Sequence, residues 1–147
     1  MPSSSKSASV YFNFPARIPL RERSRLKLFI AALFKREKKQ LATIQYVFCS
    51  DDYLLNINRQ YLDHNYYTDI ISFDLSEPNH PITAEIYISV GRIRENARQF
   101  GETLSRELHR VIFHGALHLC GYKDKSKKEK AEMRKKEDNY LALYFAD

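Results

Sequence analysis

A long apolar segment in the last third of the chain constrains the fold most. Residues 103–119 have helical spacing, because Leu104, Leu108, Val111 and Leu119 form one apolar stripe at about 100° per residue. Gly121 follows, and a glycine just beyond the last periodic residue is typical of a helix C-cap. A helix of this kind buries its stripe, so we expect it to be a central helix around which the core is built.

The rest of the chain alternates between strand and helix patterns. Short apolar patterns predict strands over residues 8–14, 43–49, 70–73 and 82–90. Helical spacing and capping residues predict helices over residues 20–39, 51–61 and 91–100, with a last helix after the capping box Ser126–Glu129. The sequence therefore predicts the α+β class, with a small mixed sheet of about four strands packed with about five helices. We expect a single domain over residues 1–147, with a flexible tail at residues 1–7.

The composition excludes several classes of protein. Hydrophobic residues make up 44% of the 147 residues, which is too apolar for a disordered chain. The longest apolar run, residues 28–34, is far shorter than the roughly 20 residues of a membrane span. The N-terminus lacks the pattern of a secretory signal, and two cysteines, Cys49 and Cys120, are too few for a disulfide framework. We expect a cytoplasmic protein with reduced thiols and no membrane partner.

The charge is positive and uneven. The net charge is +6 and the isoelectric point is about 9.3. Residues 1–40 hold ten Lys and Arg against two Asp and Glu, whereas residues 121–147 hold eight against six. This bias favours a polyanionic partner, since neutralising phosphates releases counterions. A solvated basic surface explains it equally well.

Two histidines on the long helix indicate a metal site. His114 and His118 are four residues apart at the edge of the apolar stripe, so their rings can converge on one divalent ion. Asp124 is the first strong oxygen ligand after the turn at Gly121. Two imidazoles and a carboxylate, with a fourth position left for water, are typical of catalytic zinc. The alternative is two hydrogen-bonded histidines on a packed helix; His109 points the other way.

Two residues beside the histidines need their own interpretation. Gly115 is unfavourable inside a helix, so it either lets substrate or backbone approach closely or packs against a neighbouring element. It also occupies the position where helical zinc proteases carry a catalytic Glu, which weakens a peptidase interpretation. Cys120 points away from the histidine pair by the helical period, so we interpret it as an inert core thiol.

Three segments resemble one known family. His-Gly-Ala-Leu-His-Leu-Cys-Gly-Tyr at residues 114–122 closely resembles the signature of the YbeY family of bacterial endoribonucleases and ribosomal RNA maturation factors. Tyr-Thr-Asp-Ile-Ile-Ser-Phe at 67–73 looks like the family's Pro-Thr-Asp-Val-Leu-Ser-Phe, and Ala-Glu-Ile-Tyr-Ile-Ser at 84–89 looks like its Gly-Asp-Ile-Val-Ile-Ser. The likeness covers roughly residues 53–124 in the same order.

The resemblance implies a function and a ligand set. It implies an α+β fold with one zinc ion per chain, and single-strand-specific, zinc-dependent RNA cleavage in ribosomal RNA processing and quality control. The implied partners are ribosomal RNA and the small ribosomal subunit with its proteins. His114 and His118 match the first two ligands of the family. Asp124 stands where the family usually has a third His, and its negative charge should make the metal a weaker Lewis acid.

Two further departures concern residues outside the helix. Leu62 stands where the family commonly has an Arg, which would hold a phosphate bidentately, and Arg59 one turn earlier is the candidate substitute. Glu85 replaces the usual Asp and keeps its charge. Glu85 is either a general base, an orienting partner of a ligand His, or a simple surface carboxylate.

The expected reaction is metal-assisted hydrolysis of a phosphodiester. A metal-bound water, or the RNA 2′-OH, attacks phosphorus, while Arg59 and the N-terminal basic cluster hold the backbone. Tyr66 and Tyr67 lie in a predicted loop, where they either stack on unpaired bases or simply pack.

Two other function classes stay open. One is a ribosome-assembly or RNA-binding factor with a structural metal and little nuclease activity, which salt-dependent RNA binding by His114→Ala would favour. The other is a metal-dependent hydrolase of another substrate such as a peptide, which peptide turnover without RNA turnover would favour.

Overall fold

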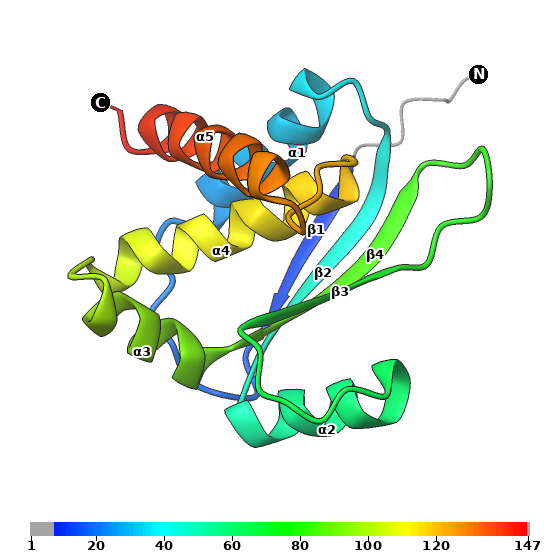
Figure 1. Cartoon of the computed structure of the whole chain (residues 1–147). Coiled ribbons are helices and arrows are strands. Elements are labelled where there is room, and N and C mark those ends of the chain that lie inside the picture. Colours follow the sequence, from blue (N-terminus) through cyan, green and yellow to red (C-terminus); the bar gives the residue numbers. More distant parts are fainter. Residues whose placement is uncertain (1–7, 147) are drawn as a thin grey trace.

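Four strands and five helices make up the part of the chain that the computed structural model describes, residues 8–146 (Figure 1). In chain order they are β1 (Ser9–Asn13), α1 (Arg23–Arg36), β2 (Leu41–Cys49), α2 (Asp51–Leu62), β3 (Ile70–Asp74), β4 (Ile82–Ser89), α3 (Val90–Gln99), α4 (Leu104–Leu119) and α5 (Lys127–Tyr144). The predicted α+β class is confirmed. The tail predicted at residues 1–7 lies outside the described residues.

The strands form one mixed sheet in the order β1-β2-β4-β3. β1, β2 and β4 are parallel, whereas β3 runs antiparallel to β4 and places Ile71 opposite Tyr87. Helices α1, α4 and α5 cover one face of the sheet, and α2 lies on the other (Figure 1). Side chains that alternate along β3 and β4 therefore face two different environments.

Capping residues set the element boundaries more sharply than periodicity does. Ser50 and Ser126 cap α2 and α5 as predicted, and the capping box of α5 is complete. Ser89 accepts a hydrogen bond from the amide of Arg92 at 3.1 Å, so residue 90 begins α3 rather than ending the strand. At α1 the left-handed backbone of Glu22, with φ of 53°, delays the helix to Arg23.

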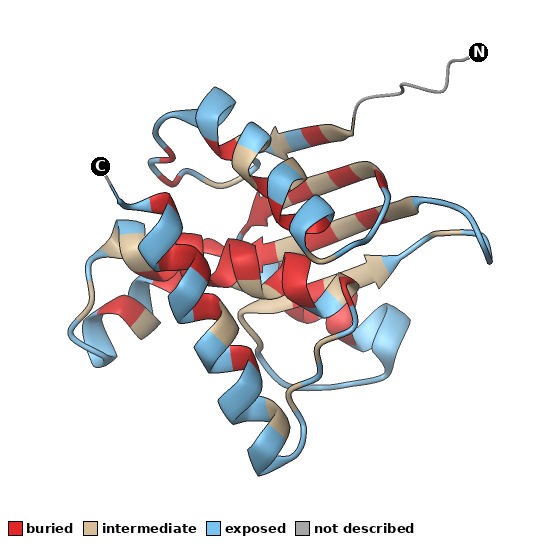
Figure 2. Cartoon of the chain, turned by 90° about the horizontal axis from the view of Figure 1, so that it is seen from above, coloured by how far each residue is buried: buried red, intermediate tan, exposed pale blue. Residues whose placement is uncertain are grey.

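The core lies between α4 and the sheet. Buried residues mark α4 along much of its length (Figure 2). Leu108 and Val111 of the predicted stripe are buried, with Leu104 and Leu119 partly buried against the same core. The fully buried Tyr46 of β2 donates its hydroxyl hydrogen to the carbonyl of Ile112 at 3.0 Å, which ties the sheet to the helix. The central position predicted for this helix is confirmed.

Gly115 lets α4 approach the sheet closely. A Cβ at this position would lie 2.8 Å from Cδ1 of Ile86 and 3.0 Å from Cδ1 of Ile70. Such distances are too short for any side chain without movement of the core. Of the two sequence interpretations, packing against a neighbouring element is the one that the structure confirms.

The two cysteines are free and buried. Burial, together with the charge of Glu37, raises the pKa of Cys120 to about 12, so this thiol stays protonated at neutral pH. The interpretation of Cys120 as an inert core thiol is confirmed. Within residues 8–146 no helix combines the length and the apolar character that crossing a membrane requires.

Candidate active site

An open cleft of about 740 Å³ lies beside α4. Helix α4 contributes Glu107, Arg110, Val111, His114 and His118, and α5 contributes Lys130, Arg134 and Glu137. The opposite bank is formed by the end of the loop before β3, with Thr68 and Asp69, and by Ile70 and Ser72 of β3. Asn96 and Phe100 line the cleft from the side of α3, and Asp124 lies on the loop that joins α4 and α5. His114, His118 and Asp124 therefore line one cleft, as the sequence predicts.

His114 is held at one ring nitrogen and faces an acidic group with the other. Its Nδ1 lies 2.7 Å from Oε2 of Glu137, and because a carboxylate can only accept, Nδ1 carries the proton. Its Nε2 lies 3.3 Å from Oδ2 of Asp124. Burial alone would lower the pKa of His114, but the hydrogen bond and charge of Glu137, with Asp124 and Asp69, outweigh burial and raise it. Nε2 and Asp124 thus require a proton or a cation between them.

His118 is held in a similar way by the backbone. Its Nδ1 lies 3.1 Å from the carbonyl oxygen of Tyr122, which can only accept, so Nδ1 again carries the hydrogen. This carbonyl is in place because Gly121, with φ of 107°, ends the helix and turns the chain back. In both histidines Nε2 is therefore the nitrogen left with a lone pair. This tautomer pattern is typical of metal-ligating histidines.

The structure does not show a complete metal site. Within residues 8–146, no three His, Cys, Asp or Glu side chains lie close enough together to share an ion. The His114–Asp124 pair and His118 line the same cleft, but the three side chains do not converge on one point. The three-ligand set stays a prediction, and the fixed Nδ1 hydrogens are the structural feature that fits it.

A buried ion pair fixes Glu137. Arg110 on α4 contacts Glu137 at 3.1 Å and Asp138 at 2.9 Å, both on α5. The side chains of Arg110 and Glu137 are each only 7% exposed. One carboxylate of α5 therefore holds both Arg110 and His114, so the packing of α5 on α4 sets the orientation of the His114 ring.

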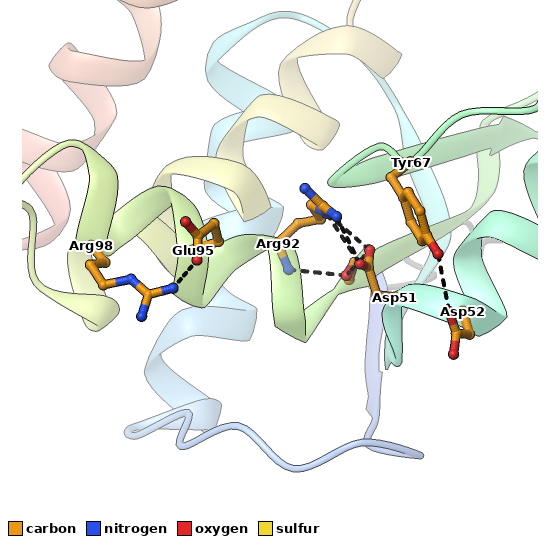
Figure 3. A network of polar contacts seen from close by, with 7 residues as sticks. Asp51, Asp52, Tyr67, Arg92, Glu95 and Arg98 are labelled. Atoms are coloured by element: carbon orange, nitrogen blue, oxygen red, sulfur yellow. Dashed lines mark hydrogen bonds and ion pairs between the residues drawn. The ribbon is translucent and has the colours of Figure 1, made fainter.

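The loop before β3 is anchored to α2 and α3. Arg92 makes bidentate contacts with Asp51 at 3.0–3.2 Å, and its guanidinium lies 4.9 Å from the centre of the Tyr67 ring (Figure 3). The hydroxyl of Tyr67 contacts Asp52 at 3.4 Å (Figure 3). This network holds the residue that precedes Thr68 and Asp69, and so fixes the second bank of the cleft.

The tyrosines predicted to stack on bases lie outside the cleft. Tyr66 stacks on His64, and Arg92 covers one face of Tyr67. Both tyrosines are about half exposed, at 55% and 46%. Their contact with bases stays a prediction, and the contacts that the structure does show are local packing.

Glu85 and Arg59 lie on the other side of the sheet. Both line a second cleft, of about 680 Å³, beside α2. Glu85 accepts a hydrogen bond from the hydroxyl of Tyr87 at 2.9 Å, whereas its neighbour Ile86 points to the opposite face and to Gly115. Arg59 contacts Asn65 at 2.5 Å. Neither residue lines the cleft that holds the histidine pair, and the carboxylate that contacts His114 is that of Glu137.

Sequence reasoning missed the acidic and basic groups around the histidines. Residues 107, 110, 114 and 118 share one face of α4 at spacings of three and four, so Glu107 and Arg110 follow from the same helical period. Asp69 lies inside a recognised motif but was given no role. No pattern marked Glu137, because its contact with His114 joins residues 23 positions apart.

These features define a class of protein: a mixed-sheet α+β domain whose central helix carries a histidine pair into an open, charged cleft. The family described as Endoribonuclease YbeY matches residues 18–144, and the chain belongs to this family. A relative named Endoribonuclease YbeY from Cytophaga hutchinsonii is 47% identical over 133 residues, which are 90% of this chain and 93% of the relative. Another relative of the same name, from Flavobacterium psychrophilum, is 44% identical over 135 residues, which are 92% of this chain and 96% of the relative.

A solved structure has the same fold. The solution structure of a Thermotoga maritima protein matches with a TM-score of 0.58 and 27% sequence identity. The match covers 91% of this chain and 87% of that one. The predicted membership of the YbeY family is therefore confirmed.

Proposed function

We propose that this chain is a zinc-dependent endoribonuclease that cuts single-stranded RNA in ribosomal RNA maturation, with the cleft beside α4 as its active site. The family membership supports RNA cleavage, and the relatives are named for it. The observation that carries the site assignment is the pair of histidines whose Nδ1 atoms are both held as donors. The proposed partners are ribosomal RNA and the small ribosomal subunit, in the cytoplasm.

The proposed ligands of one zinc ion are His114, His118 and Asp124. The contact between Nε2 of His114 and Asp124 is stable only with a positive charge between them, which a divalent ion supplies. Imidazole nitrogen and carboxylate oxygen are ordinary zinc ligands, and three of them leave an open position. A zinc ion bound there would supply an activated water and a Lewis acid for the phosphoryl group.

The remaining residues of the cleft suit a single RNA strand. Lys130 and Arg134 are exposed on the α5 bank, where they are placed to hold phosphates. Arg110 is already engaged by Glu137 and Asp138, so we assign it to positioning instead. Clefts of about 300–1,000 Å³ hold molecules of small-ligand size. A cleft of about 740 Å³ has room for one unpaired nucleotide.

Metal analysis coupled to RNA cleavage tests this function. Wild type, His114→Ala and Asp124→Ala are purified, their metal content is measured, and each is assayed with single-stranded RNA. His80→Ala is the control, because His80 lies in an exposed loop outside the cleft. We expect zinc and cleavage in wild type and control, and loss of both in His114→Ala.

Other outcomes separate the alternatives. Full cleavage by metal-free wild type contradicts the zinc mechanism. Retention of zinc by Asp124→Ala contradicts the third ligand alone. Zinc-loaded wild type that binds RNA without cutting it favours the assembly-factor alternative, and peptide turnover without RNA turnover favours a peptidase.

A further inference from the structure

Glu107 is a largely buried residue whose carboxylate has no partner among the described residues. It lies in the first turn of α4, is only 5% exposed, and lines the cleft. Within residues 8–146, no group donates a hydrogen bond to it or forms an ion pair with it. Burial, together with the negative charge of Asp69, outweighs the attraction of Arg110 and raises the pKa of Glu107. Its carboxylate oxygens are reached from the open cleft, so they are available to accept hydrogen bonds from a ligand there.

The surroundings of Glu107 point to a flat, hydrogen-bonding ligand. Asn96 and Phe100 line the same cleft from the side of α3, the helix that precedes α4. Phe100 is 62% exposed, so one face of its ring is open to a ligand in the cleft. Asp69 across the cleft is already contacted by Nδ2 of Asn96 at 3.4 Å. Of these two carboxylates, Glu107 is therefore the one left to accept hydrogen bonds from a ligand on the α3 side of the cleft.

We propose that this side of the cleft is a nucleobase subsite, in which Phe100 stacks on an unpaired base and Glu107 accepts hydrogen bonds from its Watson–Crick edge. The proposal rests on the proposed RNA substrate and names the base that is read. Single-stranded RNA is typically recognised by aromatic stacking combined with contacts to this edge. Lys130 and Arg134 line the same cleft and can hold the adjoining phosphates.

The chemistry of Glu107 selects the base. A carboxylate has two acceptor oxygens side by side. Guanine is the RNA base that presents two adjacent donors, N1–H and its exocyclic amino group, on the Watson–Crick edge. Adenine and cytosine present one amino group beside an acceptor nitrogen, and uracil presents one N–H between two carbonyls. The geometry of one unpartnered carboxylate therefore favours guanine.

Equilibrium binding tests the subsite separately from cleavage. Fluorescence anisotropy is measured with labelled oligouridylates that carry one guanine, inosine or adenine at the centre, with the full chain in EDTA to prevent cutting. We expect the guanine oligonucleotide to bind roughly tenfold more tightly than the inosine one, which lacks the amino group, as for other bidentate base contacts. We expect Glu107→Gln to reduce this ratio to less than twofold, since the amide offers only one acceptor oxygen.

Two variants control the interpretation. Phe100→Ala should weaken binding of all oligonucleotides roughly tenfold and leave the base preference unchanged, since stacking does not depend on base identity. Glu132→Gln removes an exposed glutamate of α5 outside the cleft and should change neither the affinity nor the base preference. Thermal unfolding of Glu107→Gln is measured alongside, and we expect a stability at least equal to wild type, because the change removes a partly buried charge that has no partner and raises no steric conflict.

The possible outcomes decide the proposal. Equal binding of the guanine, inosine and adenine oligonucleotides overturns it, as does a guanine preference that survives Glu107→Gln. A destabilised Glu107→Gln with an unchanged preference assigns Glu107 to folding and also overturns it. Each of these results leaves the proposed nuclease function standing if zinc-loaded wild type cuts RNA. Absence of cleavage with an intact guanine preference would instead overturn the nuclease function and retain the subsite.

Discussion

Glu137 lies 2.7 Å from Nδ1 of His114, while the opposite ring nitrogen lies 3.3 Å from Asp124. The other oxygen of Glu137 is 3.1 Å from Arg110. One carboxylate on the last helix therefore orients a candidate metal ligand and neutralises a buried arginine on the helix before it. A His ring held in this way keeps one tautomer, and its free nitrogen is directed toward the cleft.

Replacing Glu137 with Gln should weaken metal binding with little change in shape. The amide of Gln carries no negative charge, so it attracts the Nδ1 hydrogen of His114 less strongly than Glu137 does. The His114 ring therefore becomes less basic and less firmly oriented. We expect zinc affinity to fall about 10–100-fold, the range for such outer contacts, measured by competition with a chromophoric chelator. Asp138→Asn is the matched control, because it also removes a charge beside Arg110 but does not contact His114. Equal affinity in the two variants would show that Glu137 does not act on the metal site.

Adding a methyl group at Gly115 should destabilise the protein. Alanine is the better helix former by about 1 kcal/mol, but its Cβ would collide with the fully buried Ile86. We expect a net loss of about 1–2 kcal/mol for Gly115→Ala in urea unfolding. Ile86→Val removes the atom that collides, Cδ1, so the double variant should be more stable than the sum of the two single changes by at least about 0.5 kcal/mol. If the effects of the two changes on stability simply add, the steric strain of Gly115→Ala does not come from contact with Ile86.

Stability should fall in mild acid because of His109. Burial lowers the pKa of His109, aided by the charge of Arg25 and opposed by its contact with the Ser105 carbonyl. Its ring stacks on Tyr144. Below the unfolded pKa of about 6.5, the unfolded chain binds a proton that the folded protein still excludes, so stability is lost as the pH falls toward the lowered folded value.

The comparison with His109→Phe isolates this effect. Phenylalanine keeps an aromatic ring beside Tyr144 and cannot titrate. In urea titrations from pH 7 to pH 5, wild type should lose stability relative to the variant by up to about 1.4 kcal/mol per pH unit. Parallel pH profiles for the two proteins would mean that His109 does not exclude a proton in the folded state.

Arg92→Lys should loosen the loop before β3. Lysine keeps the charge but can neither contact Asp51 bidentately nor lie flat on Tyr67. We expect lower stability and faster amide exchange at residues 63–69, measured by mass spectrometry. Arg98→Lys is the control, since Arg98 pairs with exposed Glu95 on α3 and does not reach the loop (Figure 3). Unchanged exchange in Arg92→Lys would show that other contacts hold the loop.

Local chemistry made much of the fold predictable. The helical period of residues 103–119, the serine caps and the alternating strands are properties of neighbouring residues, and they led to the right elements within a few positions. The same locality made the pair His114 and His118 recognisable, because both residues lie on one helix face. The boundary at residue 90 was missed because one side chain, that of Ser89, decided it.

The sequence by itself determined the α+β class, the central helix, the histidine pair and the family. Only the tertiary structure decided that Glu137, and not Glu85, contacts His114, and that Glu107 and Asp69 line the same cleft. The physical reason is that strand alternation and the packing of helices on the sheet decide on which side of the sheet a side chain lies. Contacts between residues far apart in sequence leave no periodic pattern, so α5 could be predicted as a helix but not as the element that holds the His114 ring.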